Sequence, residues 1–180
     1  MGNNDHSHSP KMTMIELNEF NEDLLHKASS EMDLPNIRKL LLMNRTETYS
    51  PDKHEFHGLD PWIQWVSIHC GSTSKVHGLL RNGESEMLKL PQIWEVLDSK
   101  GISSGLWGLM NARRGRTEHC RFFLPDPWNH DSKTYPNYLE KFIALPRYYS
   151  KNYLAPSKYK IICKGVKTLS IMLHPRNIIE

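Results

Sequence analysis

The sequence lacks any hydrophobic run close to the length of about 20 residues that a membrane-spanning helix needs. Its first 12 residues are polar and have no apolar centre, so they do not resemble a secretory signal. Cysteine is scarce, and Cys70, Cys120 and Cys163 form no CxxC pair, which favours reduced thiols in a cytoplasmic protein. Hydrophobic residues reach only 38%, but five Trp, seven Tyr and five Phe argue against disorder throughout.

The length of 180 residues is typical of one domain. We expect a disordered lead-in over residues 1–11, an α/β domain over 12–155 and a basic helical tail over 156–180. From residue 140 onward the chain has eight Lys and Arg against two Glu. This tail could attract phosphate groups or anionic surfaces, although a solvated helical face is the plainer interpretation. No RNA-binding signature accompanies it, so nucleic acid is the least supported partner.

Hydrophobic patterns predict buried strands at residues 12–17, 102–106 and 120–124, and alternation predicts a short strand at 46–50. Helical spacing predicts helices near residues 21–28, 33–43, 60–71, 92–100, 138–149 and 157–173. Strands that alternate with helices favour an α/β fold with a largely parallel sheet and flanking helices. In the last helix, the residues expected to face inward are Ile161, Ile162, Val166, Leu169 and Met172.

Several helix boundaries have recognisable capping residues. Asn21 is expected to cap the first helix, and Pro35 suits the first turn of the second. Asp60 and Pro61 are typical of a helix start, and Gly71 is typical of a helix end.

In open parallel sheets, ligands bind beyond the carboxyl ends of the strands. Residues 18–21, 107–114 and 125–128 are therefore the segments in which a site is expected. Arg113 and Arg114 fall in the second of these, and their guanidinium groups would suit a phosphate or sulfate group. A solvated loop is the alternative interpretation of this arginine pair.

The third segment offers different chemistry. Asp126 could bind a cation or a sugar hydroxyl, and Trp128 could stack on a sugar ring, unless the segment is only a rigid turn with a packed tryptophan. His54 and His57 could contribute to a metal site, but an exposed polar loop is the favoured interpretation of their spacing.

Four segments in order carry a family resemblance: the strand and polar turn at 15–20, Leu-Pro-Asn-Ile-Arg-Lys-Leu at 34–40, the helix from Asp60-Pro-Trp to Cys-Gly71 at 60–71 and the helix-Gly-strand unit at 93–102. Together they resemble the amino-terminal half of the alkaline phosphatase–sulfatase–phosphodiesterase superfamily. The resemblance covers about residues 12–130. It implies an alkaline-phosphatase-like sheet that is incomplete in this chain.

The resemblance also assigns roles to individual residues. Asn18 stands where the family has a metal-binding Asp, and Glu16 or Glu19 would share that metal. Asn supplies a carbonyl ligand but no charge. Asp60 would face the substrate and could act as a nucleophile, although helix capping is already a sufficient role for it. Arg113 or Arg114 would bind the anion.

The implied function is a metal-dependent hydrolase or transferase of phosphate or sulfate esters, with zinc, calcium, magnesium or manganese as cofactor. The substrate would be a small ester that could contain a sugar. Because the family draws further metal ligands from its carboxyl-terminal half, we expect a truncated or inactive form. The alternative is a catalytically silent member that binds a glycan or a partner protein. An unpaired sheet edge in a truncated chain would also favour self-association.

Overall fold

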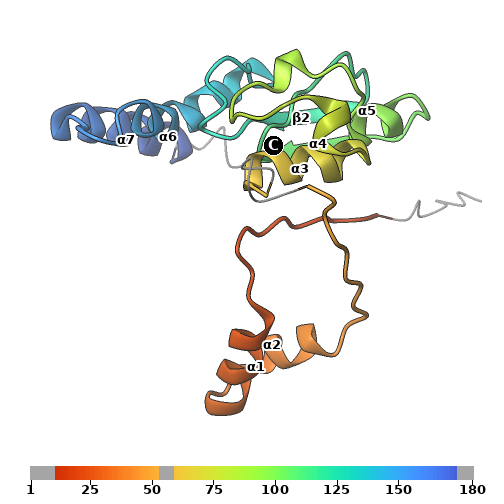
Figure 1. The fold of residues 1–180 in the computed structure, drawn as a ribbon. Coiled ribbons are helices and arrows are strands. Elements are labelled where there is room, and N and C mark those ends of the chain that lie inside the picture. The colour runs from red at the N-terminus through yellow and green to blue at the C-terminus, as the bar shows by residue number, and fades with distance from the viewer. Residues whose placement is uncertain (1–10, 53–58, 174–180) are drawn as a thin grey trace, which may run out of the picture. The chain divides into compact units, whose positions relative to one another are not determined.

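The computed structural model describes residues 11–52 and 59–173 (Figure 1). The lead-in before residue 11 and the histidines His54 and His57 lie outside the described residues, as do residues 174–180. The chain divides into two compact units, Met1–Glu47 and Thr48–Glu180, and each is described by itself.

The first unit contains the helices α1 (Glu22–Glu31) and α2 (Pro35–Leu41). Asn21 caps α1, because its side-chain oxygen accepts a hydrogen bond of 2.8 Å from the backbone N–H of Leu24. Pro35 occupies the first turn of α2, where its missing N–H costs no helical hydrogen bond. Both predicted helix starts are confirmed.

The strand predicted at residues 12–17 is wrong. The segment has no strand assignment, and the side chains of Met12, Ile15 and Leu17 are 79%, 76% and 55% exposed. A strand needs a neighbour to accept its backbone hydrogen bonds, and the described part of the first unit contains only helices and irregular backbone. The short strand expected at 46–50 is absent for the same reason.

The second unit holds a small sheet of two parallel strands, β1 (Ser104–Trp107) and β2 (Cys120–Leu124). Leu106 lies opposite Phe123 in the register. The two predicted strands and their parallel pairing are confirmed, but the fold is mixed and mostly helical. Its helices are α3 (Pro61–Cys70), α4 (Ser74–His77), α5 (Ile93–Asp98), α6 (Glu140–Lys151) and α7 (Lys158–Met172). Short 3₁₀ turns occupy Ser85–Met87 and Asn137–Leu139.

Two apolar clusters form the core of this unit. One joins α5 to the sheet, and its buried members are Trp94, Leu106, Ala112, Cys120 and Phe123. The other lies under α3, and its buried members are Val66, Leu79 and Leu88. Gly71 ends α3 in the left-handed conformation that glycine adopts at little cost, as predicted. Asp60 precedes α3 as expected, but its side chain accepts no capping hydrogen bond from the helix.

Asn111 joins the loop after β1 to the segments around it. Its side chain is fully buried, and its backbone is left-handed with φ of 50°. Its Nδ2 donates to the carbonyls of Trp62 (2.8 Å) and Arg81 (2.9 Å), and its Oδ1 accepts from the N–H of Gly83 (2.7 Å). Short amide side chains tolerate this backbone conformation better than most residues do. One buried asparagine therefore bonds three backbone groups from separate segments.

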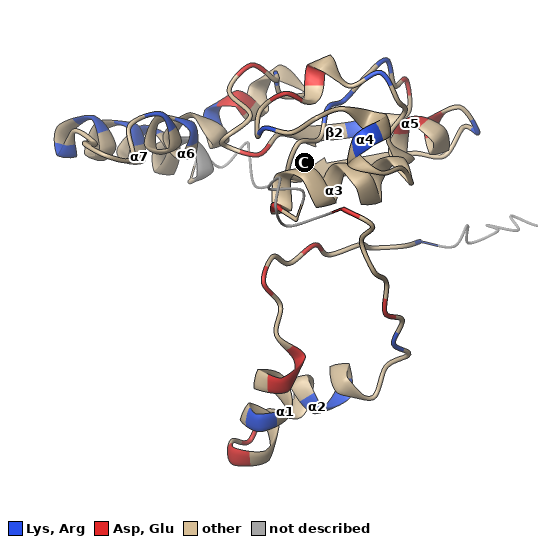
Figure 2. Ribbon diagram, in the orientation of Figure 1, with Lys and Arg blue, Asp and Glu red and all other residues tan. Residues whose placement is uncertain are grey.

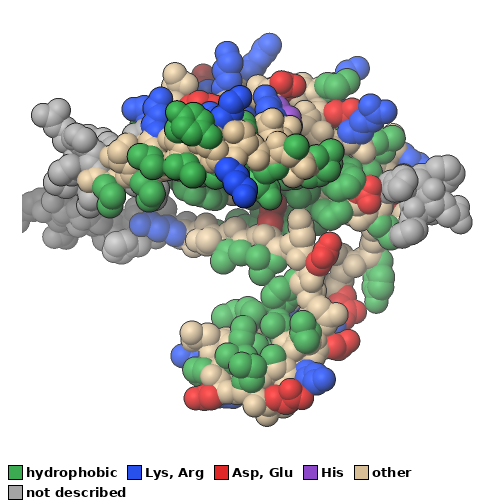
Figure 3. All heavy atoms as spheres, turned by 90° about the vertical axis from the view of Figure 1, so that its left-hand side faces the viewer, with side chains coloured by type: hydrophobic (Ala, Val, Ile, Leu, Met, Phe, Trp, Pro, Cys, Tyr) green, Lys and Arg blue, Asp and Glu red, His purple; other side chains and the backbone are tan. Residues whose placement is uncertain are grey.

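Helix α7 does not bury the face that the sequence predicted. Ile162, Val166 and Leu169 are 63%, 61% and 57% exposed, so their expected inward orientation is wrong. The helix packs on α6 through a narrower face that includes Ile161 and Gly165. Figure 2 shows basic and no acidic residues along α7, and Figure 3 shows hydrophobic side chains at the surface on this side of the unit.

Replacing Asn111 with alanine should destabilise the second unit strongly. Asn111→Ala removes three hydrogen bonds made by a fully buried side chain, which we expect to cost about 3 kcal/mol. Urea unfolding followed by circular dichroism measures this change. The matched control is Asn152→Ala, which removes an exposed asparagine whose amide donates only to the Tyr148 carbonyl. Equal effects of the two substitutions would contradict the role given to Asn111.

Candidate anion-binding site

A cleft of about 830 Å³ lies beside β2, where Phe123 pairs with Tyr135 in an isolated antiparallel bridge. The loop between β1 and β2 supplies one wall, and the segment after the β2 turn supplies another. The lining residues are Glu86, Glu95, Arg113, Arg114, Gly115, Arg116, Phe123, Asp131, Lys133, Thr134 and Tyr135. Four of these are basic and three are acidic.

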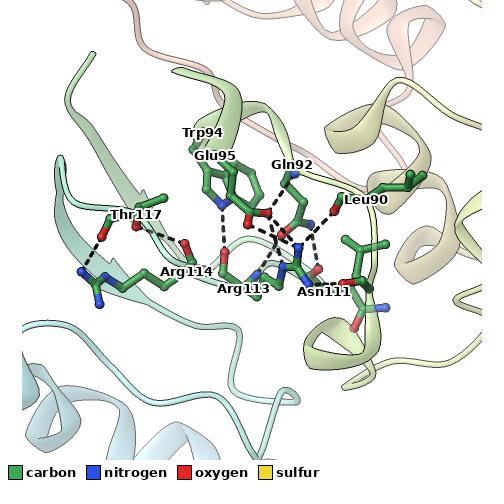
Figure 4. A network of polar contacts seen from close by, with 9 residues as sticks. Leu90, Gln92, Trp94, Glu95, Asn111, Arg113, Arg114 and Thr117 are labelled. Atoms are coloured by element: carbon green, nitrogen blue, oxygen red, sulfur yellow. Dashed lines mark hydrogen bonds and ion pairs between the residues drawn. The ribbon is translucent and has the colours of Figure 1, made fainter. Parts of the chain in front are cut away.

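The Arg113 side chain donates its hydrogen bonds to acceptors within the protein. Its Nε and Nη2 donate to the Glu95 carboxylate at 3.2–3.3 Å, and the two side chains are each only 16% exposed. Nη2 also donates to the Leu90 carbonyl at 3.1 Å, and Nη1 donates to the Leu88 carbonyl. Figure 4 shows this guanidinium surrounded by acceptors. Arg113 therefore stabilises the fold by joining these segments, and few of its N–H groups remain for a ligand.

Side chains at the start of α5 also form hydrogen bonds with the backbone around Arg113. The Gln92 side chain donates to the Asn111 carbonyl (3.1 Å) and accepts from the Arg113 N–H (2.9 Å). The Trp94 indole donates to the Arg113 carbonyl at 2.8 Å. These bonds tie the loop to the start of α5, where Gln92 and Glu95 also form a capping box.

Arg114 points away from this network in Figure 4. Its guanidinium carbon lies 3.8 Å from the centroid of the Tyr135 ring, a cation–π distance. Its Nη2 donates to the Thr117 carbonyl at 2.7 Å. Its Nε is buried and has no hydrogen-bond partner among the described residues. The ring and the carbonyl thus hold Arg114 in one orientation with a donor still unsatisfied.

The other charged residues that line the cleft differ in whether their side chains already have a partner. Arg116 and Lys133 are exposed, and neither forms an ion pair with a carboxylate in the described ranges. On the acidic side, the Glu86 carboxylate accepts a hydrogen bond of 2.8 Å from the Ser132 hydroxyl, while Asp131 is exposed. Once Arg113 and Glu95 neutralise each other, three cations face two carboxylates.

The turn after β2 contributes structure to the unit and not to the cleft lining. Asp126 is 5% exposed, and its Oδ1 accepts from the Trp128 N–H at 2.8 Å. Burial raises the pKa of this carboxyl above its usual value. The Trp128 ring lies 5.4 Å from the Tyr153 ring, so the two aromatic rings pack on each other. Neither Asp126 nor Trp128 lines the cleft, and Asp60, at the start of α3, does not line it either.

The expected metal ligands Asn18, Glu16 and Glu19 all belong to the first unit. They follow one another in irregular backbone before α1, and Glu19 is left-handed with φ of 55°. Across residues 11–52 and 59–173, no group of three or more His, Cys, Asp or Glu side chains is arranged to hold a metal ion. Asp60 and the two arginines belong to the second unit.

A second cluster in this unit has the residue types of a catalytic triad but not its proton arrangement. The Nδ1 of His77 accepts from the Leu79 N–H at 3.1 Å, so the neutral ring carries its proton on Nε2. Nε2, 3.0 Å from the Ser67 hydroxyl, then donates to it, and Ser67 donates to the Ile63 carbonyl. Asp52 accepts from Ser74, at 2.6 Å. His77 cannot accept the Ser67 proton in this state.

Of the residues that line this cleft, the sequence analysis proposed Arg113 and Arg114 as anion ligands and did not name Lys133 or Tyr135. A local signal for Tyr135 exists, because the residue before a proline favours extended backbone, and Pro136 follows it. Nothing in the sequence pairs that segment with β2. Comparison with known proteins adds no assignment, since no family model, curated protein or solved structure matches this chain. No helix in the described ranges is long and apolar enough to cross a membrane.

The buried His77 should make the second unit sensitive to mild acid. Burial lowers the pKa of His77 below its usual 6.5, so the unfolded chain binds this proton more tightly. The stabilisation is complete above about pH 6.5 and is lost as the pH falls toward the folded-state pKa. We expect the free energy of unfolding to fall less steeply in His77→Gln than in the wild type over this range, as measured by urea unfolding.

The control for this experiment is His26→Gln, which replaces an exposed histidine of the first unit. A residual slope should persist in His77→Gln, because burial and the nearby Lys151 and Arg147 also lower the pKa of His130. A pH slope in His77→Gln that equals the slope of the wild type would contradict the assignment of His77 as a buried neutral group.

Proposed function

We propose that the cleft beside β2 binds the phosphate or sulfate group of a small ester, with Arg114 as its main ligand. In this proposal the chain is a divergent, catalytically silent relative of the alkaline phosphatase superfamily, represented by its amino-terminal part. The ester could carry a sugar. Two observations support this function: the family resemblance seen in the sequence and the geometry of Arg114.

The observation that carries the proposal is the state of the Arg114 guanidinium. Tyr135 and the Thr117 carbonyl hold it in place, so little side-chain entropy remains to be lost on binding. Its buried Nε–H has no described acceptor, and an unsatisfied buried donor costs about 1–3 kcal/mol. An anionic oxygen that reached this guanidinium from the cleft would form a charge-assisted hydrogen bond with it.

The surroundings support an anion over a neutral ligand. Arg116 and Lys133 are exposed on the lining and can approach a bound group, and Thr134 adds a hydroxyl. Both phosphate and sulfate present several acceptor oxygens of similar geometry, so the two groups share this chemistry. Glu86 and Asp131 also line the cleft and would repel an anion, which favours a ligand that places its charge next to Arg114.

Metal-dependent hydrolysis of the same esters is the other function that the resemblance implies. It would assign Asp60 as the nucleophile and Asn18, Glu16 and Glu19 as ligands of zinc, calcium, magnesium or manganese. This hypothesis rests on the resemblance alone, because none of those four residues lines the cleft. Turnover of an aryl phosphate or aryl sulfate in the presence of these metals would support it.

Calorimetric titration of the full chain with phenyl phosphate and phenyl sulfate tests the proposed binding. We expect saturable binding of at least one ester by the wild type, and a loss of about 10- to 100-fold in affinity for Arg114→Gln. The matched control is Arg121→Gln, which removes an exposed arginine on β2 that donates to Ser103 and does not line the cleft. Its affinity should equal that of the wild type.

The Arg113→Gln substitution tests whether Arg113 stabilises the fold and does not act mainly as a ligand. Because it breaks a largely buried ion pair, we expect a lower melting temperature, with destabilisation of about 3 kcal/mol or more. Binding by Arg114→Gln as tight as in the wild type, or no binding of either ester by a folded wild-type chain, would refute the proposed function.

A further inference from the structure

One face of α7 exposes a regular stripe of apolar side chains. Its members are Tyr159, Ile162, Val166, Leu169 and, just after the helix, Leu173, and each is more than half exposed. Their spacing alternates between three and four residues, so they lie along a single side of the helix. We call this set the α7 stripe. It is large for exposed apolar surface on one short helix, which indicates a contact surface.

The opposite side of α7 is already occupied by the protein. Helices α6 and α7 pack side by side (Figure 1). The Thr168 hydroxyl donates to the Lys141 carbonyl at 3.4 Å, and the Lys164 ammonium lies 5.7 Å from the centroid of the Tyr148 ring. Because α6 covers this side, a partner cannot wrap around α7. Only a flat surface or one further helix can meet the stripe.

The charged residues of α7 itself all have one sign, although Glu140 of α6 lines a pocket with Lys164 and Lys167. From Lys141 to Leu173 the sequence contains no Asp or Glu, and Figure 2 shows only basic charges on α7. The basic residues of this stretch are Lys141, Arg147, Lys151, Lys158, Lys160, Lys164 and Lys167. Two copies that met along their stripes would bring lysines together with no carboxylate on α7 to pair them. The charge therefore favours an anionic partner over a second copy.

We propose that the α7 stripe docks on the surface of an anionic lipid membrane, with the helix lying parallel to the surface. Apolar residues on one side and lysines on the others are typical of helices that lie at the lipid–water boundary. Lysine stems can extend past the apolar contact so that their ammonium groups reach the headgroups. Tyr153 and Tyr159, both more than half exposed, have amphipathic rings that suit the same boundary. Figure 3 shows hydrophobic side chains next to basic ones on this side of the unit.

Sedimentation of the full chain with lipid vesicles tests this proposal. Vesicles of phosphatidylcholine mixed with phosphatidylserine should bind the protein, whereas vesicles of phosphatidylcholine alone should bind it much more weakly. The double substitution Val166→Ser and Leu169→Ser should weaken binding by roughly tenfold or more, because it removes inserted apolar area. Its control is Ile68→Ser, which replaces an exposed apolar residue of α3.

Substitution of charge tests the electrostatic part separately. Lys160→Gln and Lys167→Gln should each weaken binding to the anionic vesicles by about fivefold, and added salt should weaken wild-type binding. Lys100→Gln, at an exposed position after α5, is the matched control. Circular dichroism of each variant confirms that it is folded.

Three outcomes would overturn the proposal: no binding of the wild type to anionic vesicles, equal binding to both vesicle types, or equal binding by the stripe variant and the wild type. Analytical ultracentrifugation without lipid tests whether the α7 stripe instead joins two copies of the chain. Self-association that the Val166→Ser and Leu169→Ser substitutions abolish would show that the stripe joins two copies of the chain, and would refute the membrane assignment.

Discussion

The ion pair between Arg113 and Glu95 is the interaction on which the loop between β1 and β2 depends. The two side chains are largely buried, and the arginine also donates to the carbonyls of Leu88 and Leu90. Removing one partner of such a pair leaves a buried charge, which costs about 3–5 kcal/mol. Through these bonds a single side chain joins the loop, the start of α5 and the segment before it.

This pair also explains why two neighbouring arginines have different roles. Arg113 is turned toward Glu95, and Arg114 is turned the other way (Figure 4). The guanidinium of Arg114 lies over the Tyr135 ring. Gly115 permits the close passage of the loop past Glu95, because a Cβ built there would lie 2.2 Å from a Glu95 oxygen, and φ is +65°. The cleft exists because the loop is held this close to α5 while Arg114 remains at its edge.

Local signals predicted much of the fold and less of the site. Asn21, Pro35 and Gly71 act as the sequence indicated, because caps depend on adjacent backbone. Residues 12–17 have the pattern of a strand, but the described part of the first unit contains no neighbouring strand. Strand formation depends on a partner that a local pattern cannot reveal. The α7 side chains were assigned inward because helical spacing identifies an apolar face without saying what covers it. The sequence marked Arg114 as a candidate anion ligand, but it did not predict the bridge to β2 that brings Tyr135 beside this arginine.

The most direct test of these assignments is an NMR titration that follows the side-chain Nε–H signals of arginines while inorganic phosphate is added to the labelled protein. The account predicts that the Arg114 signal shifts in a saturable way because the bound anion contacts its guanidinium. The Arg113 signal, already bonded to Glu95, should stay in place. A shift of Arg113 with Arg114 unchanged, or no saturable shift of either, would contradict the division of roles between the two arginines.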